Sequence, residues 1–351
     1  MAVVAGAGMA GLVAAARLRE LGRPVEVLEK GDRPGGSMLL SSGVVWRHRT
    51  LESFREDCPG GDPVLQRLIF ERLDDALDWL ERVAVPPVEG ETGNPWTAGR
   101  RFEPHPLTEA LARAAGGVSV SRPLAALPDE PVVLATGGFA AKLARERGLL
   151  LRAAPWSEGD GLRLAEERGA ALTGGMGEFY GRALPAPPAR VEEPDFVRAA
   201  QLYGRFATVA DDAGRPVFAG PPSWSENDLV QAIARQPGGT AWYRVDASAL
   251  TERVRDRTVG DMVDVAEELG GEVRRESSGA VAVKVAAAVT HTLGGLRVDE
   301  QSRVLDAAGT AVDGIWAAGV DVGGIATGGY ASGLATALVL GLTAAESITA
   351  S

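Results

Sequence analysis

Cysteine, lysine and long apolar runs are scarce in this chain of 351 residues. With Cys58 as the one cysteine, no disulfide can form within the chain, and we expect a reducing, cytoplasmic location. Three lysines and a net charge of −11 exclude the basic surface that nucleic-acid binding needs, so no nucleic-acid partner is predicted. The apolar stretch 334–345 falls short of the roughly 20 residues that span a bilayer, so no membrane insertion is expected.

A glycine-rich motif, GAGMAG, stands at residues 6–11. Around it we expect a strand over 1–5, a helix over 10–21 and a strand over 25–28, followed at once by Glu29. In that context the glycines permit a tight turn, close approach of the backbone to a pyrophosphate and close helix–strand packing. The helix amino terminus faces the phosphates, and Glu29 can accept hydrogen bonds from a ribose. The motif predicts a dinucleotide site without distinguishing FAD from NAD.

Further glycine-rich segments recur along the chain. A polar loop covers 31–43, a buried strand over 131–135 stops at Thr-Gly-Gly, and a strand over 314–319 precedes Asp321. We expect helices over 107–115, 162–168 and 331–348, a strand near 118–120, and a helix that begins at Asp62-Pro63 with the aspartate as its cap.

Prolines and turn residues cluster from about residue 174 to about residue 280. We therefore predict an α/β fold in which a Rossmann-like domain, residues 1–173 and 285–351, is interrupted by a smaller α+β capping domain, residues 174–284. The capping domain is the predicted substrate domain.

Five motifs in this order resemble the flavoprotein family of fumarate reductase, succinate dehydrogenase and 3-ketosteroid dehydrogenase. They are GAGMAG with Glu29, RPGGSMLLSSG, VLATGGF, EGDGLRLAEERGA, and HTLGGLRVD through WAAGVD to the last helix. The resemblance covers most of 1–172 and 285–351 and implies FAD as the cofactor. Because RPGGSMLLSSG lacks histidine, the FAD is expected to be bound non-covalently.

The resemblance also implies roles for single residues, and no metal site. Asp321 would accept from a ribityl hydroxyl, and the start of the last helix would face the pyrimidine edge of the flavin. The predicted cofactor-binding residues are Gly6, Gly8, Met9, Ala10, Gly11, Glu29, Lys30, Gly35, Gly36, Ser37, Ser41, Ser42, Gly43, Ala135, Thr136, Gly137, Asp160, Gly319, Asp321, Ser332 and Leu334.

The sequence departs from its relatives at the substrate positions. His291 matches the family's substrate-binding histidine, but no arginine lies between Asp321 and the last helix, so fumarate or succinate is disfavoured. Against the steroid dehydrogenases, Thr327 and not Tyr330 falls at the catalytic tyrosine's place. The catalytic candidates are therefore His291, Tyr330 and Tyr180, each of which could instead be a packed side chain.

From these observations we predict an FAD-dependent oxidoreductase. It would transfer hydride between flavin N5 and a carbon next to a carbonyl, in a neutral or weakly acidic, partly apolar small molecule. The electron donor or acceptor and the direction of reaction stay open. The alternative is a flavin-binding partner or scaffold protein with lost or altered catalysis, which the missing arginines would suit.

Overall fold

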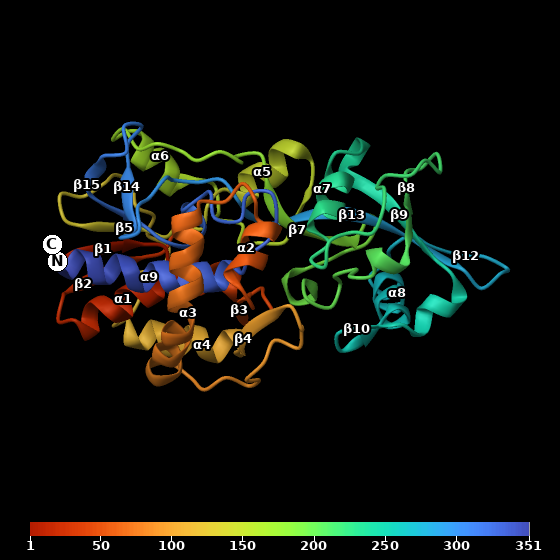
Figure 1. Cartoon of the computed structure of the whole chain (residues 1–351), viewed down its shortest axis with the longest axis horizontal. Helices are drawn as coiled ribbons and strands as arrows, with labels where there is room; N and C mark the ends of the chain where they lie inside the picture. The colour runs from red at the N-terminus through yellow and green to blue at the C-terminus, as the bar shows by residue number, and fades with distance from the viewer. Residues whose placement is uncertain (351) are drawn as a thin grey trace. The chain divides into compact units, whose positions relative to one another are not determined.

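The computed structural model describes residues 1–350 and divides into two compact units (Figure 1). Unit 1 comprises residues 1–142, 153–178 and 291–351, and unit 2 comprises residues 143–152 and 179–290. From the sequence, the inserted domain was predicted at residues 174–284. In the structure the second unit starts five residues later, ends six residues later, and takes in a short earlier segment as well.

Unit 1 is built on a five-stranded sheet in the order β14-β15-β5-β1-β2. Its strands are β1 (Ala2–Ala5), β2 (Val25–Leu28), β5 (Val132–Leu134), β15 (Ala311–Ala317) and β14 (Arg303–Leu305). All pairings are parallel except that of β14 with β15. Strands β1 and β5 are short, apolar and fully buried, as expected for parallel strands covered on both faces. The predicted α/β class with a Rossmann-like domain is confirmed.

Strand β1 lies between β2 and β5, and this order positions the site. The chain leaves β1 through helix α1 (Met9–Glu20) to β2 on one side, whereas β5 pairs with the other side of β1. The connections therefore diverge between the carboxyl ends of β1 and β5. In open parallel sheets, ligands bind at such a switch point.

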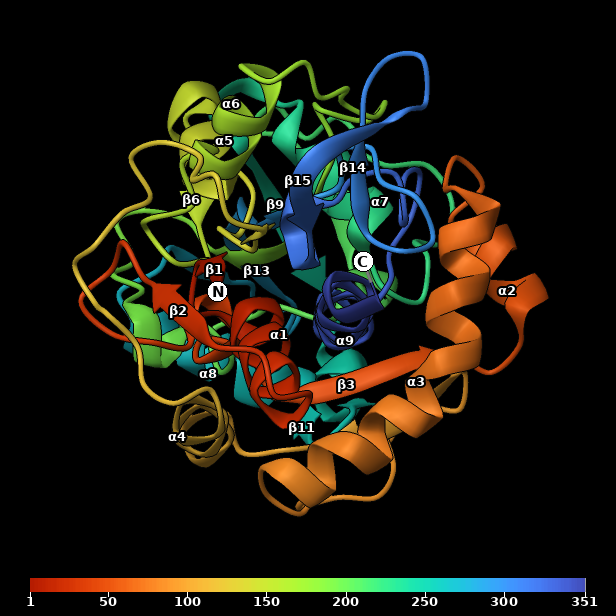
Figure 2. The same ribbon diagram turned by 90° about the vertical axis from the view of Figure 1, so that its left-hand side faces the viewer.

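Helix α9 (Gly333–Ala350) packs directly against α1 in the interior of unit 1 (Figure 2). A Cβ added to Gly341 would lie 2.7 Å from the main-chain oxygen of Ala10, so the two backbones need glycine to approach this closely. Within residues 1–350, α9 is the one helix long and apolar enough to cross a membrane, but two thirds of that stretch is buried. It is the core helix of the unit.

Helices α3 (Pro63–Val83) and α4 (Pro104–Ala114) flank this pair. The predicted cap of α3 is confirmed: Asp62 Oδ1 accepts from the N–H groups of Val64 and Leu65, and Pro63 opens the helix. The predicted strand near 118–120 is reduced to a single bridge between Leu28 and Ser119, because the chain turns away at Ser121, which has φ +54°.

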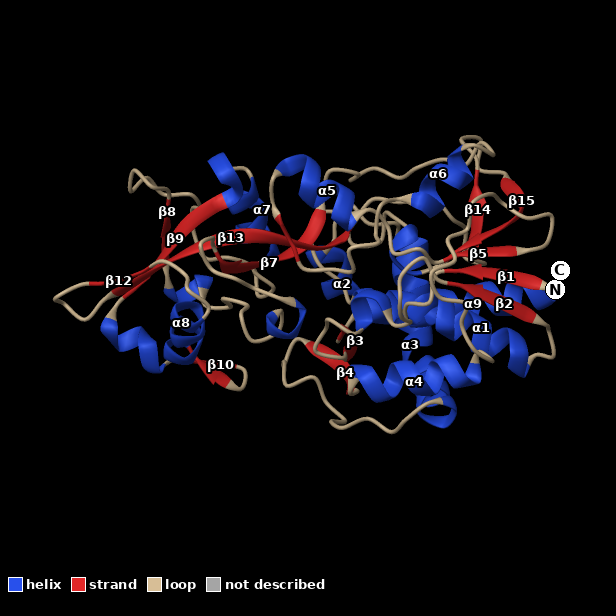
Figure 3. Ribbon diagram, turned by 180° about the vertical axis from the view of Figure 1, so that it is seen from behind, coloured by secondary structure: helices blue, strands red, loops and turns tan. Residues whose placement is uncertain are grey.

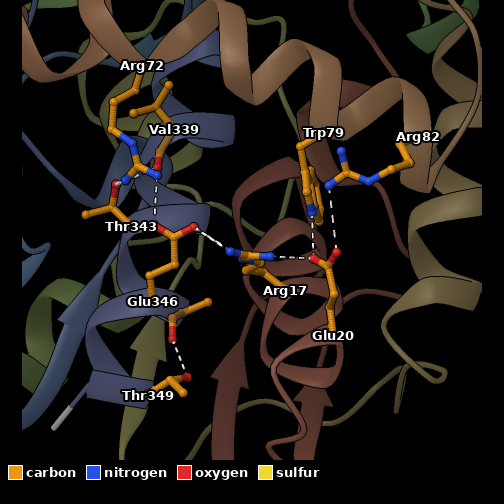
Figure 4. Close-up of polar contacts among 10 residues, drawn as sticks. Arg17, Glu20, Arg72, Trp79, Arg82, Val339, Thr343, Glu346 and Thr349 are labelled. Atoms are coloured by element: carbon orange, nitrogen blue, oxygen red, sulfur yellow. Dashed lines mark hydrogen bonds and ion pairs between the residues drawn. The ribbon is translucent and has the colours of Figure 1, made fainter.

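A network of charged groups ties α1, α3 and α9 together (Figure 4). Arg17 lies 2.7 Å from Glu20 and 3.1 Å from Glu346, and Arg72 lies 2.7 Å from Glu346. Trp79 donates its indole N–H to Glu20. Burial opposes the charge of Glu20, but the bonds from Trp79 and Arg17 outweigh it and hold the pKa of Glu20 below its usual value.

The remaining elements of unit 1 were not expected from the sequence, apart from α6 (Asp160–Glu166). They include the hairpin of β3 (Val44–His48) and β4 (Thr97–Arg101), and α2 (Leu51–Asp57). The short 3-10 turns η1 (Gly36–Met38) and η6 (Gly319–Asp321) lie in the glycine-rich segments. The boundary between the units falls within α5 (Ala140–Arg147).

Unit 2 has a twisted sheet in the order β12-β13-β9-β8, drawn in red in Figure 3. Strands β6 and β7 also pair with the long central strand β13. Its strands are β6 (Leu150–Leu151), β7 (Phe179–Pro185), β8 (Thr208–Ala210), β9 (Thr240–Val245), β12 (Val273–Arg275) and β13 (Val281–Thr292), with a small hairpin of β10 (Arg253–Val254) and β11 (Arg257–Thr258). Its helices are α7 (Asn227–Ala234) and α8 (Val259–Glu268), with 3-10 turns η2 (Glu193–Asp195), η3 (Gly204–Phe206), η4 (Pro237–Gly239) and η5 (Ala247–Thr251).

Candidate functional site

The first glycine loop turns at the carboxyl end of β1, where it meets the end of β5. Gly6 has φ +104°, and a Cβ on it would lie 2.1 Å from the main-chain oxygen of Ala135. A Cβ on Gly11 would lie 1.9 Å from the main-chain oxygen of Gly6. Only glycine permits this turn and this packing of α1 on the sheet. No side chain caps the start of α1, which leaves its first N–H groups for a ligand.

The second glycine loop lies against the first. The N–H of Gly35 donates to the main-chain oxygen of Ala7 at 2.7 Å, and Gly8 and Gly35 form a bridge. Two predicted serines hold the second loop: Ser41 bonds to Met38 and Gly43, and Ser37 accepts from the N–H of Ala154. Two segments separated by about 27 residues thus form one backbone surface.

Glu29 joins the ends of these loops. Its carboxylate is buried and accepts from the N–H of Ala7 at 2.7 Å and from the N–H of Gly31 at 2.6 Å. A carboxylate has further acceptor capacity beyond two bonds, so Glu29 can still accept from a sugar hydroxyl. Its position after β2 is the one that selects a free 2′-hydroxyl.

In this structure the carboxylates of Asp321 and Asp160 both bond to other residues of the protein. Asp321 is fully buried, and both of its oxygens accept from Thr136 and Gly138, the shortest at 2.5 Å from the N–H of Thr136. Burial raises the pKa of Asp321, while these bonds act in the opposite direction. Asp160 pairs with Lys30 at 2.7 Å. The predicted ribityl contact of Asp321 stays a prediction.

Two of the predicted glycines leave the backbone open on one side, as close approach of a diphosphate would require. A Cβ on Gly8 would meet nothing closer than the main-chain oxygen of Gly35 at 3.9 Å, and one on Gly137 would meet nothing within 4 Å. A side chain at either position would instead fill the open space beside the backbone. Gly319, which follows β15, lies close to the first glycine loop: a Cβ added to it would lie 2.9 Å from the Cβ of Ala10. Residues from three separate motifs therefore converge on one end of the sheet.

A second group in unit 1 gathers at the start of α9. A Cβ on Gly333 would lie 3.2 Å from Cε1 of His291, so the imidazole lies at the amino terminus of the helix. The ring of Tyr330 is centred 6.5 Å from that of His291 and 5.2 Å from that of Trp46. Ser332, also predicted, accepts from the N–H of Ala335. The structure thus brings His291 of β13 next to Tyr330 and the start of α9, which follow one another in the chain.

Most of the chain matches a family of known proteins. Residues 116–335 match the model described as the FAD binding domain, and residues 4–46 match that of the NAD(P)-binding Rossmann-like domain. The chain belongs to the FAD-binding domain family. The cofactor left open between FAD and NAD by the first motif is therefore FAD, and the protein is an FAD-dependent oxidoreductase.

Relatives of this family agree with that assignment. A probable fumarate reductase of Shewanella frigidimarina is 22% identical over 418 residues, covering 92% of this chain and 70% of the relative. The structure of a flavocytochrome c3 fumarate reductase matches with a TM-score of 0.69 and 20% identity, covering 100% of this chain and 78% of that one. A 3-ketosteroid-Δ4-(5α)-dehydrogenase of Rhodococcus jostii matches with a TM-score of 0.72 and 18% identity, covering 99% and 96%. The suspected flavoprotein family is confirmed.

Within this family, the glycine loops and Glu29 are the residues suited to hold FAD. With FAD bound, Gly8 and Gly36 would offer backbone to the pyrophosphate, and Glu29 would offer its carboxylate to the adenosine ribose. The start of α9 would offer N–H groups and the positive end of a helix dipole to a reduced, negatively charged flavin ring. The roles of these residues at the cofactor stay predictions.

Tyr180 belongs to unit 2, unlike the other two catalytic candidates. It is buried on β7, and the guanidinium of Arg182 lies 5.0 Å from its ring centre. Arg182 in turn donates to the main-chain oxygen of Ser225 and faces the carboxyl of Glu226. Burial raises the pKa of Glu226 to about 7, although Arg182 acts in the opposite direction. No sequence motif indicated this buried charged group.

Some residues beside Tyr330 were not predicted as part of a site from the sequence. Trp46, His48, Asp57 and Cys58 belong to no recognised motif, and only their contacts reveal them. Arg47, which follows the second glycine loop in sequence, pairs with Asp74 at 2.7 Å. Among residues 1–350, no three histidine, cysteine or acidic side chains are close enough together to hold a metal ion.

Proposed function

We propose that this oxidoreductase acts on a carbon–carbon bond next to a carbonyl in a neutral, partly apolar small molecule. Hydride passes between flavin N5 and the β-carbon, and a proton is exchanged at the α-carbon, next to the carbonyl. The observation that carries the proposal is the gathering of His291, Tyr330 and the amino terminus of α9 in one unit. A carbonyl substrate needs a hydrogen-bond donor at its oxygen and a group that handles a proton at the neighbouring carbon. Histidine and tyrosine can supply these two functions.

Each residue has a distinct role in this proposal. Bound FAD supplies the hydride chemistry. His291 donates a hydrogen bond to the carbonyl oxygen, where negative charge develops, and thereby lowers the barrier. Tyr330 exchanges the proton at the α-carbon, next to the carbonyl, through its hydroxyl. Trp46, in edge-to-face contact with Tyr330, provides an apolar wall beside it.

The charges of unit 1 favour a neutral substrate over a dicarboxylate. Arg47, the arginine nearest in sequence to the second glycine loop on its carboxyl side, is held by Asp74 and stacks over Phe70 with its guanidinium 4.6 Å from the ring centre. The segment from Asp321 to α9 contains no arginine. A second carboxylate would lack the planar fork that binds it best. The Rhodococcus relative was solved with 4-androstene-3,17-dione, itself a neutral enone, which supports the carbonyl class.

The direct test follows the flavin spectrum without oxygen. A panel of saturated ketones is mixed with the oxidised protein, and a panel of cyclic and acyclic enones with the dithionite-reduced protein. We expect a saturated ketone to bleach the oxidised protein, or an enone to restore the absorbance of the reduced protein. In either case the change should be faster than the same compound produces with free FAD. Fumarate and succinate serve as the competing dicarboxylates. Turnover of these two alone would contradict the proposed substrate class.

Variants test the two roles with whichever compound reacts. Tyr330→Phe removes one hydroxyl and should slow the flavin step by about 10²–10⁴-fold, the usual contribution of a positioned acid or base. Tyr203→Phe is the matched control, because Tyr203 lies in unit 2 and its buried hydroxyl has no hydrogen-bond partner among residues 1–350. Equal rates for Tyr330→Phe and Tyr203→Phe would remove Tyr330 from the proposal.

A further inference from the structure

Strand β3 presents two aromatic rings on the same face. Residues two apart in a strand point to the same side, and the rings of Trp46 and His48 meet edge to face with centres 5.3 Å apart. Arg47, between them, points to the opposite side and pairs with Asp74 of α3. Both Trp46 and His48 are buried, so the two rings form a fixed part of the interior.

Further rings extend this pair at both ends. At one end the ring of Tyr330 packs edge to face on Trp46, with centres 5.2 Å apart. At the other end Phe54 of α2 stacks on His48, with centres 4.9 Å apart and planes 18° from parallel. The order Tyr330–Trp46–His48–Phe54 defines an aromatic row. A shift of His48 would therefore be transmitted to Tyr330 through one indole.

Asp57 fixes the imidazole within the aromatic row. Its Oδ2 lies 3.0 Å from Nε2 of His48, and Asp57 ends α2 only three residues after Phe54. His48 has 2% of its side chain exposed and Asp57 35%, so the carboxylate reaches inward from a partly wet position. A hydrogen bond between an imidazole and a carboxylate orients the ring and resists its rotation.

The same turn also holds the backbone of Tyr330. Cys58, next to Asp57, accepts a hydrogen bond on Sγ from the N–H of Tyr330. A Cβ on Gly329 would lie 1.6 Å from the main-chain oxygen of Asp57, so the two segments are in direct contact. The N–H of Gly60 bonds to the main-chain oxygen of Thr327 at 3.1 Å. Residues 57–60 thus hold the backbone around Tyr330 in place, while the aromatic row packs against its ring.

We propose that His48, oriented by Asp57, is a positioning residue that fixes the ring of Tyr330 through Trp46. His48 has Trp46 between it and the phenol, so it acts on the substrate only through that intermediate ring. The catalytic consequence rests on the proposed function of Tyr330, whereas the positioning itself does not. It can therefore be tested without a substrate.

Fluorine NMR of the FAD-loaded protein carrying 3-fluorotyrosine provides that test. The chain has four tyrosines, so four resonances are expected, and Tyr330→Phe identifies the one from Tyr330. His48→Leu should move or split the Tyr330 resonance by more than its linewidth and leave the other three in place. His105→Leu, the same change at an exposed histidine of α4, should leave all four unchanged.

Conservative variants keep the proposal falsifiable if His48→Leu does not fold, which would be seen as collapse of all four resonances. His48→Gln keeps a nitrogen donor for Asp57 but loses the ring, and Asp57→Asn keeps an oxygen acceptor but loses the charge. We expect each to displace the Tyr330 resonance alone, His48→Gln less than His48→Leu. A Tyr330 resonance that stays in place in both folded variants overturns the proposal.

The rate of the flavin step then separates this inference from the proposed function. With a compound that reacts with the wild-type protein, His48→Leu should slow the step by about 10–100-fold, as expected for a misplaced reacting group. If Tyr330→Phe leaves the rate unchanged, the proposed function fails, while the NMR result still decides the positioning. If Tyr330→Phe slows the flavin step, but His48→Leu leaves both the rate and the Tyr330 resonance unchanged, the positioning inference fails and the proposed function stands.

Discussion

Glu226 gives a prediction whose size follows from its surroundings. The residue is 6% exposed, and its backbone has φ +57°, in the left-handed region that few residues other than glycine adopt. The N–H of Arg205 donates to it at 3.4 Å, and Arg182 faces it. Burial outweighs these partners and raises its pKa from 4.5 to about 7.

The sign of the resulting pH dependence follows from proton binding. Between pH 4.5 and 7 the folded protein keeps the proton on Glu226, whereas the unfolded chain has released it. The free energy of unfolding therefore falls as the pH rises through this window, and the loss is complete above pH 7. At 1.36 kcal/mol per pH unit, a rise of the pKa to about 7 corresponds to a cost of about 3 kcal/mol at pH 8.

Glu226→Gln should remove this cost, because the amide has nearly the same shape and does not ionise. We expect the variant and the wild type to differ little at pH 5, and the variant to be more stable by about 3 kcal/mol at pH 8. The measurement is chemical denaturation of the FAD-loaded protein at pH 5, 6, 7 and 8. Glu252→Gln, at an exposed position of the same unit, is the control.

The difference between Glu226→Gln and the wild type, followed against pH, is the decisive quantity. Any constant cost of fitting the amide shifts all points equally and leaves the slope intact. Parallel curves from pH 5 to 8 would refute the reasoning, because they would mean that Glu226 ionises in the folded protein as it does in the unfolded chain.

Four further outcomes are expected. The purified protein should be yellow and release FAD on acid treatment, and a colourless protein that cannot be reconstituted with FAD would contradict the cofactor. Glu29→Arg should weaken FAD binding roughly tenfold or more, since a lost bond to a charged acceptor is worth about 1.5–3 kcal/mol; an unchanged Kd would show that Glu29 does not meet the ribose. His291→Ala should slow flavin reduction by about 10²–10³-fold at a nearly unchanged Tm, and loss of the flavin instead would indicate a packing role. Burial raises the pKa of Cys58 to about 12, so its thiol should resist alkylation at pH 8 until the protein unfolds, and rapid labelling of the native protein would show that the 57–60 turn opens.

Several features follow from residues that are close together in the sequence. GAGMAG and Glu29 predict a strand, a helix and a second strand, and all three form within one residue of the expected limits. Asp62 and Pro63 cap α3 as expected. In each case neighbouring residues restrict the same stretch of backbone, so local preference and the final fold agree. The resemblance to flavoproteins rests on such local motifs.

The surroundings of Tyr330 were decided by the tertiary structure. His48 and Asp57 lie nine residues apart on a strand and a helix that the sequence did not predict, and Tyr330 comes from a loop more than 270 residues later. The raised pKa of Glu226 likewise depends on the rings and backbone packed around it in unit 2. A linear pattern records which side chains are present, but burial and contact between distant segments arise only when the chain folds. The backbone geometry of the cofactor loops could therefore be predicted from the sequence, whereas the surroundings of Tyr330 and Glu226 could not.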